Sequence, residues 1–224
     1  MDDSEIIYHK TIKKICERFG RIYHKKLQSQ LYGVTDHQMS VAIVRELNLP
    51  ISIYDFEMQM TDMVKKYLPN APLKDGAERL LRHLKVNKVP FALVTNSTSH
   101  AVRMHASARP EIFNLFQHKV CITDSDVHHG KPHPDIYLTA AARFTPKALP
   151  SQCLVFEDST VGVQAAVEAG MQVIMIPDQR LKRDFTRNAT LVLKSLLDFK
   201  PELFGLPAFT DDPEKIKRQT MKKK

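Results

Sequence analysis

The sequence predicts an α/β protein in which a doubly wound parallel sheet follows a smaller, all-helical part at the amino end. Up to Pro72 the residues show helical periodicity, whereas short β-rich runs alternate with helical stretches from there on. Such alternation is typical of parallel βαβ units. Polar residues follow the first strands, and ligands of open α/β sheets bind beyond the carboxyl ends of the strands. We therefore expect the functional groups to gather at that edge of the sheet.

Three helices are expected in the amino-terminal part. The first carries apolar residues at helical spacing from Tyr8 to Phe19 and ends at Gly20. The second begins at Thr35 or Asp36 and stops before Pro50. The third carries a Met-rich stripe, which we interpret as core packing: Phe56, Met60, Met63 and Tyr67.

From residue 73 on, strands and helices are expected to alternate along the chain. The expected strands lie within residues 89–97, 118–126, 152–158, 172–178 and, as a last short strand, 190–196. The expected helices cover residues 76–85, 133–144 and 160–170.

Composition favours a globular protein. The 224 residues are 43% apolar, which is enough for a sizeable core. The net charge of +8 is spread thinly except at the basic end, residues 208–224, where we expect a disordered tail. No basic stripe indicates a nucleic-acid surface, and no apolar run reaches the roughly 18 residues of a membrane span. We interpret the three cysteines, Cys16, Cys121 and Cys153, as reduced thiols, and we expect no signal peptide. We therefore predict a cytoplasmic protein. We also predict that it is a monomer and binds neither nucleic acid nor membrane.

Two adjacent carboxylates, Glu157 and Asp158, end the apolar run "LVF". Adjacent acids at a strand tip repel each other unless a cation lies beside them. Mg²⁺ suits such a place, because it takes one or two protein carboxylates and keeps several waters. The alternative is that Asp158 caps the next helix while Glu157 is solvated. These residues alone leave both readings open.

Two further segments carry candidate phosphate-binding groups. Thr95 and Asn96 follow the run "FALV", where a hydroxyl and backbone N–H groups can bind an anion, although an ordinary turn fits as well. Lys131 lies between Gly130, which permits a tight backbone, and two prolines, so it is either a fixed positive charge or a surface lysine in a turn. Three neighbouring histidines are expected in a solvated loop: His128, His129 and His133.

Taken in order, these segments resemble the haloacid dehalogenase-like hydrolases. "LVTNS", "GKPHPDIY" and "VFEDSTVGVQAAVEAGM" are similar to that family's second, third and fourth motifs. The resemblance implies a helical cap domain at residues 1–72, a phosphatase-like core at 73–207 and a tail at 208–224. It also implies Mg²⁺-dependent hydrolysis of a small, nucleotide-like phosphomonoester such as pseudouridine 5′-phosphate. By this resemblance the phosphate would be bound by Thr95, Asn96 and Lys131. Of these, Thr95 and Lys131 would also be catalytic groups. The metal ligands would be Asp158 and Glu157.

The family's first motif is expected to lie outside this sequence. That motif, D-x-D-G-T/V, supplies the aspartate nucleophile and the general acid, and in capped members it precedes a D-S-E or D-T-E sequence. Here "DDSE" is residues 2–5, so the resemblance places the nucleophile before Met1. It also implies that a central strand, between the strands ending at Thr95 and Glu157, is missing. Either the natural protein has an upstream extension, or this is a truncated isoform or pseudoenzyme that binds a phosphate ligand or a protein partner.

Overall fold

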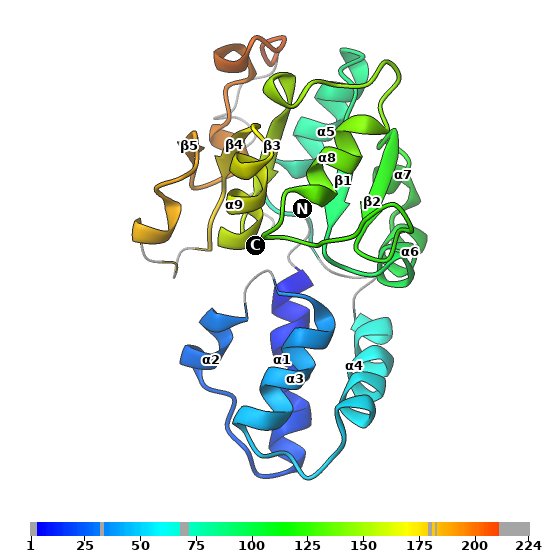
Figure 1. Ribbon diagram of the computed structural model, residues 1–224, viewed down its shortest axis with the longest axis vertical. Coiled ribbons are helices and arrows are strands. Elements are labelled where there is room, and N and C mark those ends of the chain that lie inside the picture. Colours follow the sequence, from blue (N-terminus) through cyan, green and yellow to red (C-terminus); the bar gives the residue numbers. More distant parts are fainter. Residues whose placement is uncertain (1–3, 32–33, 68–71, 179–180, 182, 211–224) are drawn as a thin grey trace.

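The computed structural model describes residues 4–31, 34–67, 72–178, 181 and 183–210, and it has two parts (Figure 1). Helices α1–α4 lie together at one end, and the strands lie with α5–α9 at the other. The predicted tail covers residues 208–224, and its part from residue 211 on lies outside the described residues, as do Asp2 and Asp3.

The helical part is formed by α1 (Ser4–Arg18), α2 (Lys25–Gln30), α3 (Asp36–Glu46) and α4 (Ile53–Tyr67). The sequence pattern did not predict α2. Apolar faces of the helices meet in one core, whose most buried members are Ile12, Ile15, Cys16, Ile43 and Phe56.

Helix α3 begins where the pattern predicted. The Thr35 hydroxyl accepts a hydrogen bond from the backbone N–H of Gln38, whose side chain accepts one in return from the N–H of Thr35. The stripe predicted on α4 is wrong at its carboxyl end, because Val64 is buried there whereas Tyr67 is 37% exposed.

The second part alternates strands and helices, which confirms the predicted fold class. Its elements are α5 (Ala77–Val86), β1 (Ala92–Thr95), α6 (Ser99–Ala108), α7 (Pro110–Phe113), β2 (His118–Cys121), α8 (Asp135–Ala142), β3 (Leu154–Glu157), α9 (Thr160–Glu168), β4 (Gln172–Met175) and β5 (Leu191–Val192). Helix α5 packs on one side of β3 through Leu154 and Phe156, and α8 and α9 pack on the other through Val155.

The described strands form two parallel sheets rather than one. Strand β1 pairs with β2, and β3, β4 and β5 pair in that order. Figure 1 shows the strands side by side in the order β5, β4, β3, β1, β2, so the unpaired edges of β1 and β3 are neighbours. All four residues of β1 are only half-buried, unlike those of a strand paired on both sides. This arrangement is compatible with the missing central strand that the resemblance implies.

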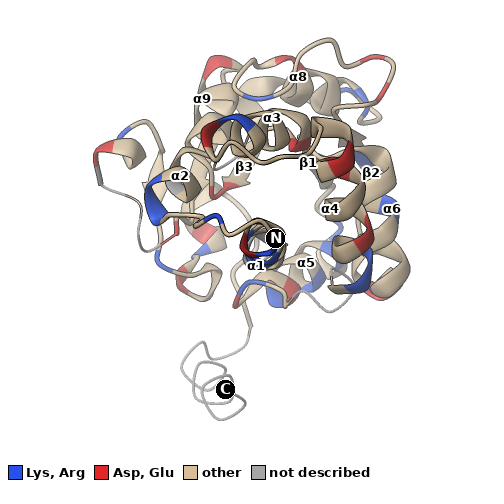
Figure 2. Cartoon of the chain, turned by 90° about the horizontal axis from the view of Figure 1, so that it is seen from below, with Lys and Arg blue, Asp and Glu red and all other residues tan. Residues whose placement is uncertain are grey.

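Two further observations concern the surface and the cysteines. None of the helices that the structure describes is long and apolar enough to cross a membrane. Seen from the helical end, charges of both signs are interspersed over the elements (Figure 2). All three cysteines are free thiols, as predicted.

Candidate active site

Lys131 connects the two sheets. Its ammonium donates to the carbonyl of Val94 in β1 at 3.2 Å and to Oε1 of Glu157 in β3 at 2.5 Å. The side chain is 9% exposed, so the reading of a surface lysine in a turn is wrong. A buried ammonium is thereby fixed at the carboxyl ends of both sheets, where the sequence predicted the functional groups.

The backbone around Lys131 is fixed as tightly as its side chain. The Asn96 amide accepts from the N–H of Lys131 at 2.9 Å and donates to its carbonyl at 3.2 Å. A Cβ on Gly130 would lie 2.5 Å from Cδ1 of Ile122 and 2.8 Å from Oδ1 of Asn96, so a side chain here would displace the Asn96 amide or the Ile122 side chain. The Asn96 side chain therefore orients the lysine, and its part in binding phosphate stays a prediction.

Glu157 is buried and accepts hydrogen bonds with both oxygens. Oε1 accepts from Lys131 and, at 2.5 Å, from the hydroxyl of Tyr137. Oε2 accepts from the N–H of Asp158 and from the N–H and hydroxyl of Ser159, at 3.0 to 3.3 Å. The reading of a solvated Glu157 is therefore wrong. The sequence patterns did not indicate Tyr137, which lies within the segment "GKPHPDIY" and shares the Glu157 carboxylate with Lys131.

These contacts also set the charges of the site. Burial raises the pKa of Glu157, but the charge of Lys131 and the hydrogen bonds from Lys131 and Tyr137 hold that pKa below its ordinary value. Burial and the nearby Glu157 charge raise the pKa of Tyr137, so its hydroxyl keeps the proton that it donates. The site thus contains a carboxylate at Glu157 and a neutral phenol at Tyr137.

The helix that follows Glu157 is capped by Ser159, whose hydroxyl accepts from the N–H of Gly162 at 3.1 Å. The reading in which Asp158 caps this helix is therefore wrong. Gly162 lies against the carboxylate: a Cβ there would be 2.1 Å from Cδ of Glu157. The first turn of α9 can cover Glu157 only because this position has no side chain.

Asp158 has a different partner. Its Oδ2 is 2.5 Å from the ammonium of Lys74, which lies between α4 and α5 and which the sequence patterns did not indicate. Burial raises the pKa of Asp158, whereas the charge of Lys74 lowers it, and the pKa ends below its ordinary value. The Asp158 side chain is 36% exposed, so it remains accessible to solvent and to ions.

Thr95 ends β1 close to the Val94 carbonyl that Lys131 contacts. Its Oγ1 accepts from the N–H of Ser97 at 3.0 Å, which leaves the hydroxyl proton for another acceptor. The polar residues that follow β2 serve the fold instead, since Asp124 is paired with Arg143 at 2.8 Å.

Asp158 fits a magnesium ion as one protein ligand. Its Oδ1 makes no hydrogen bond within the described residues, and Mg²⁺ commonly takes one or two carboxylates and completes its shell with water and phosphate. Glu157 fits an orienting role, since its oxygens already accept five hydrogen bonds. No cluster of three His, Cys, Asp or Glu residues that could hold an ion is found among the residues that the structure describes.

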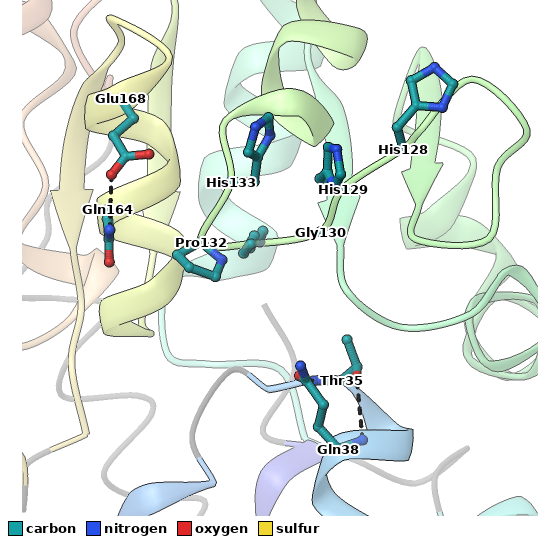
Figure 3. A pocket seen from close by; sticks show the side chains of 10 residues that line it. Thr35, Gln38, His128, His129, Gly130, Pro132, His133, Gln164 and Glu168 are labelled. Carbon is teal, nitrogen blue, oxygen red and sulfur yellow. Dashed lines mark hydrogen bonds between the residues drawn. The ribbon is translucent and has the colours of Figure 1, made fainter.

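A pocket of about 440 Å³ separates the helical part from the loop that carries Lys131 (Figure 3). Thr35 and Gln38 of the helical part face the loop across it, and Gln164 and Glu168 of α9 lie at its side. Its histidines are exposed, in agreement with a solvated loop, and the rings of His129 and His133 lie 4.5 Å apart.

The buried pair gives a stability prediction. Glu157→Gln should lower the free energy of unfolding by about 3–5 kcal/mol at pH 7, because it leaves the Lys131 ammonium buried without a counter-charge. Urea unfolding followed by circular dichroism measures it. A depressed carboxyl pKa stabilises the fold above the ordinary value of about 4.3, and this contribution is lost as pH falls through the folded value. The difference from wild type should therefore shrink in acid.

The exposed Glu168, which accepts a hydrogen bond from Gln164, provides the matched control. Glu168→Gln should change the stability by less than about 0.5 kcal/mol. Equal effects of the two substitutions would contradict the assignment of Glu157 as the counter-charge of Lys131.

Comparisons with known proteins find a matching family model and several similar proteins. Residues 8–170 match the family model described as haloacid dehalogenase-like hydrolase. A Drosophila melanogaster protein named probable pseudouridine-5′-phosphatase is 47% identical over 210 residues, covering 93% of this chain and 91% of its own. An Arabidopsis thaliana (DL)-glycerol-3-phosphatase 1 is 37% identical, over 93% of this chain and 71% of its own. A β-phosphoglucomutase structure from Clostridium difficile, 19% identical, superimposes with a TM-score of 0.75 over 99% of this chain and 94% of its own.

Proposed function

Because this chain belongs to the haloacid dehalogenase-like hydrolases, we propose that it carries the phosphate-binding and metal-binding groups of a Mg²⁺-dependent phosphatase for small phosphomonoesters. The observation that carries this proposal is the Lys131 ammonium, which is buried at the carboxyl ends of both sheets and held by Glu157. A fixed cation at that place is suited to the charge of a transferring phosphoryl group.

Each motif residue has a role in this proposal. Lys131 neutralises charge on the phosphoryl oxygens, and Thr95 donates its hydroxyl to one of them. Asn96 orients Lys131 through two hydrogen bonds and offers its backbone N–H to phosphate. Asp158 is a ligand of Mg²⁺, and Glu157 holds Lys131 in place and supports the metal site. When bound, the ion would polarise the phosphate and offset its charge.

The substrate we propose is pseudouridine 5′-phosphate. The name of the relative at 47% identity, probable pseudouridine-5′-phosphatase, supports this substrate. The relative at 37% identity is named (DL)-glycerol-3-phosphatase, so glycerol 3-phosphate is the second candidate substrate. The nucleophilic aspartate and the general acid would come from a D-x-D-G motif that the resemblance places before Met1. The rival proposal is a pseudoenzyme that binds a phosphate ligand or a protein partner. A cytoplasmic monomer stays a prediction.

The role of Lys131 can be tested in the chain extended at its amino end by an apolar strand and a D-x-D-G motif. Lys131→Ala should lower kcat about 10²–10³-fold, because the lysine stabilises charge that develops in the transition state. Phosphate release from pseudouridine 5′-phosphate in the presence of Mg²⁺ measures it. The matched control is Lys147→Ala, since Lys147 is exposed in a loop.

Two outcomes would contradict this proposal. A change of less than about threefold in Lys131→Ala would mean that the lysine serves only the turn, since one lost electrostatic group typically costs much more. No phosphate release by the extended chain, with or without Lys131, would favour the pseudoenzyme.

A further inference from the structure

Lys74 contributes a charge to the site from outside the motifs. Its ammonium lies 2.5 Å from Oδ2 of Asp158, although the two residues are 84 positions apart in the chain. The segment "PLKDG" that contains Lys74 joins α4 of the helical part to α5. A cation from the connection between the two parts thus lies on the carboxylate proposed as metal ligand.

The backbone on both sides fixes Lys74 in this position. Leu73 packs against two core clusters that both contain residues of α5, and the carbonyl of Asp75 accepts from the hydroxyl of Ser195 at 3.2 Å. Gly76 has a φ of +89°, and a Cβ there would lie 2.7 Å from the backbone N of Leu197. The lysine therefore projects from a fixed backbone, unlike a surface side chain that samples many positions.

The two ion pairs of the site differ in accessibility. In the Lys131–Glu157 pair the side chains are 9% and 7% exposed, whereas in the Lys74–Asp158 pair they are 23% and 36% exposed. Breaking the first pair would leave a charge buried in the protein, which is costly. The second pair can exchange partners more easily, because water can solvate the released ammonium.

We propose that Lys74 is a tethered ammonium that neutralises Asp158. A divalent cation has to displace this ammonium from the carboxylate before it can bind. Lys74 therefore makes the affinity of the site for Mg²⁺ lower than it would be without the lysine. This inference rests on the proposed function only in the assignment of Asp158 as metal ligand. An ammonium and Mg²⁺ compete for the same carboxylate and repel each other if both stay close to it. Metal binding is thereby coupled to the segment that joins the two parts.

Titration calorimetry of the chain with MgCl₂ alone tests this. Lys74→Met should bind Mg²⁺ about tenfold more tightly than wild type, the effect expected for removing one unit charge close to a divalent ion at high dielectric constant. Lys85→Met removes the same charge from an exposed position on α5 and should leave the affinity unchanged. Lys74→Arg keeps the charge and should stay close to wild type.

The double variant shows whether the effect passes through Asp158. In an Asp158→Asn background, Lys74→Met should no longer tighten Mg²⁺ binding. Thermal unfolding gives a second measurement: at the same Mg²⁺ concentration the Tm of Lys74→Met should rise more than that of wild type, because a ligand that binds the folded state more tightly stabilises it more.

Equal or weaker Mg²⁺ binding by Lys74→Met would overturn the proposal, and so would no binding at all by this variant. The proposal would also be overturned if Lys74→Met still increased the affinity for Mg²⁺ in the Asp158→Asn background. These outcomes are independent of turnover. If the extended chain releases no phosphate while Lys74→Met binds Mg²⁺ more tightly, the proposed function fails and the role of Lys74 stands.

Discussion

The 224-residue chain should release no phosphate above background from pseudouridine 5′-phosphate or p-nitrophenyl phosphate in the presence of Mg²⁺. The same chain extended by an apolar strand and a D-x-D-G motif should turn over pseudouridine 5′-phosphate at about 1–10³ s⁻¹, the range of ordinary enzymes. The reason is that Lys131 and Thr95 can stabilise a phosphoryl group but cannot attack it. The aspartate nucleophile that the family uses is the group that the extension adds.

A matched control is the extended chain with asparagine in place of the first aspartate of the motif. It should fold equally well and release no phosphate above background, because it lacks only the attacking carboxylate. Robust turnover by the 224-residue chain that is lost in Asp158→Ala would contradict the prediction and would identify a different nucleophile.

The second large effect concerns the sheet. We expect the 224-residue chain to be poorly soluble or to melt without a sharp cooperative transition, because neighbouring edges of β1 and β3 are not paired with each other. A peptide that copies the family's first strand should bind there in parallel orientation. A buried strand adds about four large apolar side chains, and burying each of them contributes about 1.5–3 kcal/mol of free energy. The peptide could therefore contribute roughly 6–12 kcal/mol of stabilisation, from which the free-energy cost of association is subtracted.

Thermal unfolding at increasing peptide concentration measures this effect, since a ligand of the folded state raises Tm with its concentration. A scrambled peptide of the same composition is the control. A sharp transition above about 55 °C, within the usual range of mesophile domains, and no response to the peptide would show that the chain closes its sheet unaided.

Local patterns in the sequence predicted most elements of the fold. Each strand of the α/β part falls within an apolar run followed by polar residues or a turn, and the helices α5, α8 and α9 overlap the helices expected there. Helices α6 and α7, which lie between β1 and β2, were not predicted. Helix α2 was missed because it is only six residues long and shows no clear stripe. The two-sheet arrangement could not follow from local patterns, because strand pairing depends on residues that are distant in the sequence.

The site could be predicted in part for the same reason. Glu157 and Asp158 stood out because two adjacent carboxylates follow an apolar run, and Lys131 because it lies between a glycine and two prolines. Tyr137 gave no signal, since an aromatic residue on a helix next to a sheet is ordinary core, and only the structure shows its hydroxyl on Glu157. Lys74 resembled any lysine in a turn, because its partner lies 84 residues away.

The contact between Gly162 and Glu157 has a consequence for the evolution of this site. A Cβ at position 162 would overlap the Glu157 carboxylate, so a mutation at either position alone is constrained by the other. The two positions should therefore covary among relatives: any side chain at 162 should accompany a residue shorter than glutamate at 157. In such relatives the buried lysine would need a different carboxylate as its counter-charge. A change at positions 157 and 162 would therefore require a change at a third position as well.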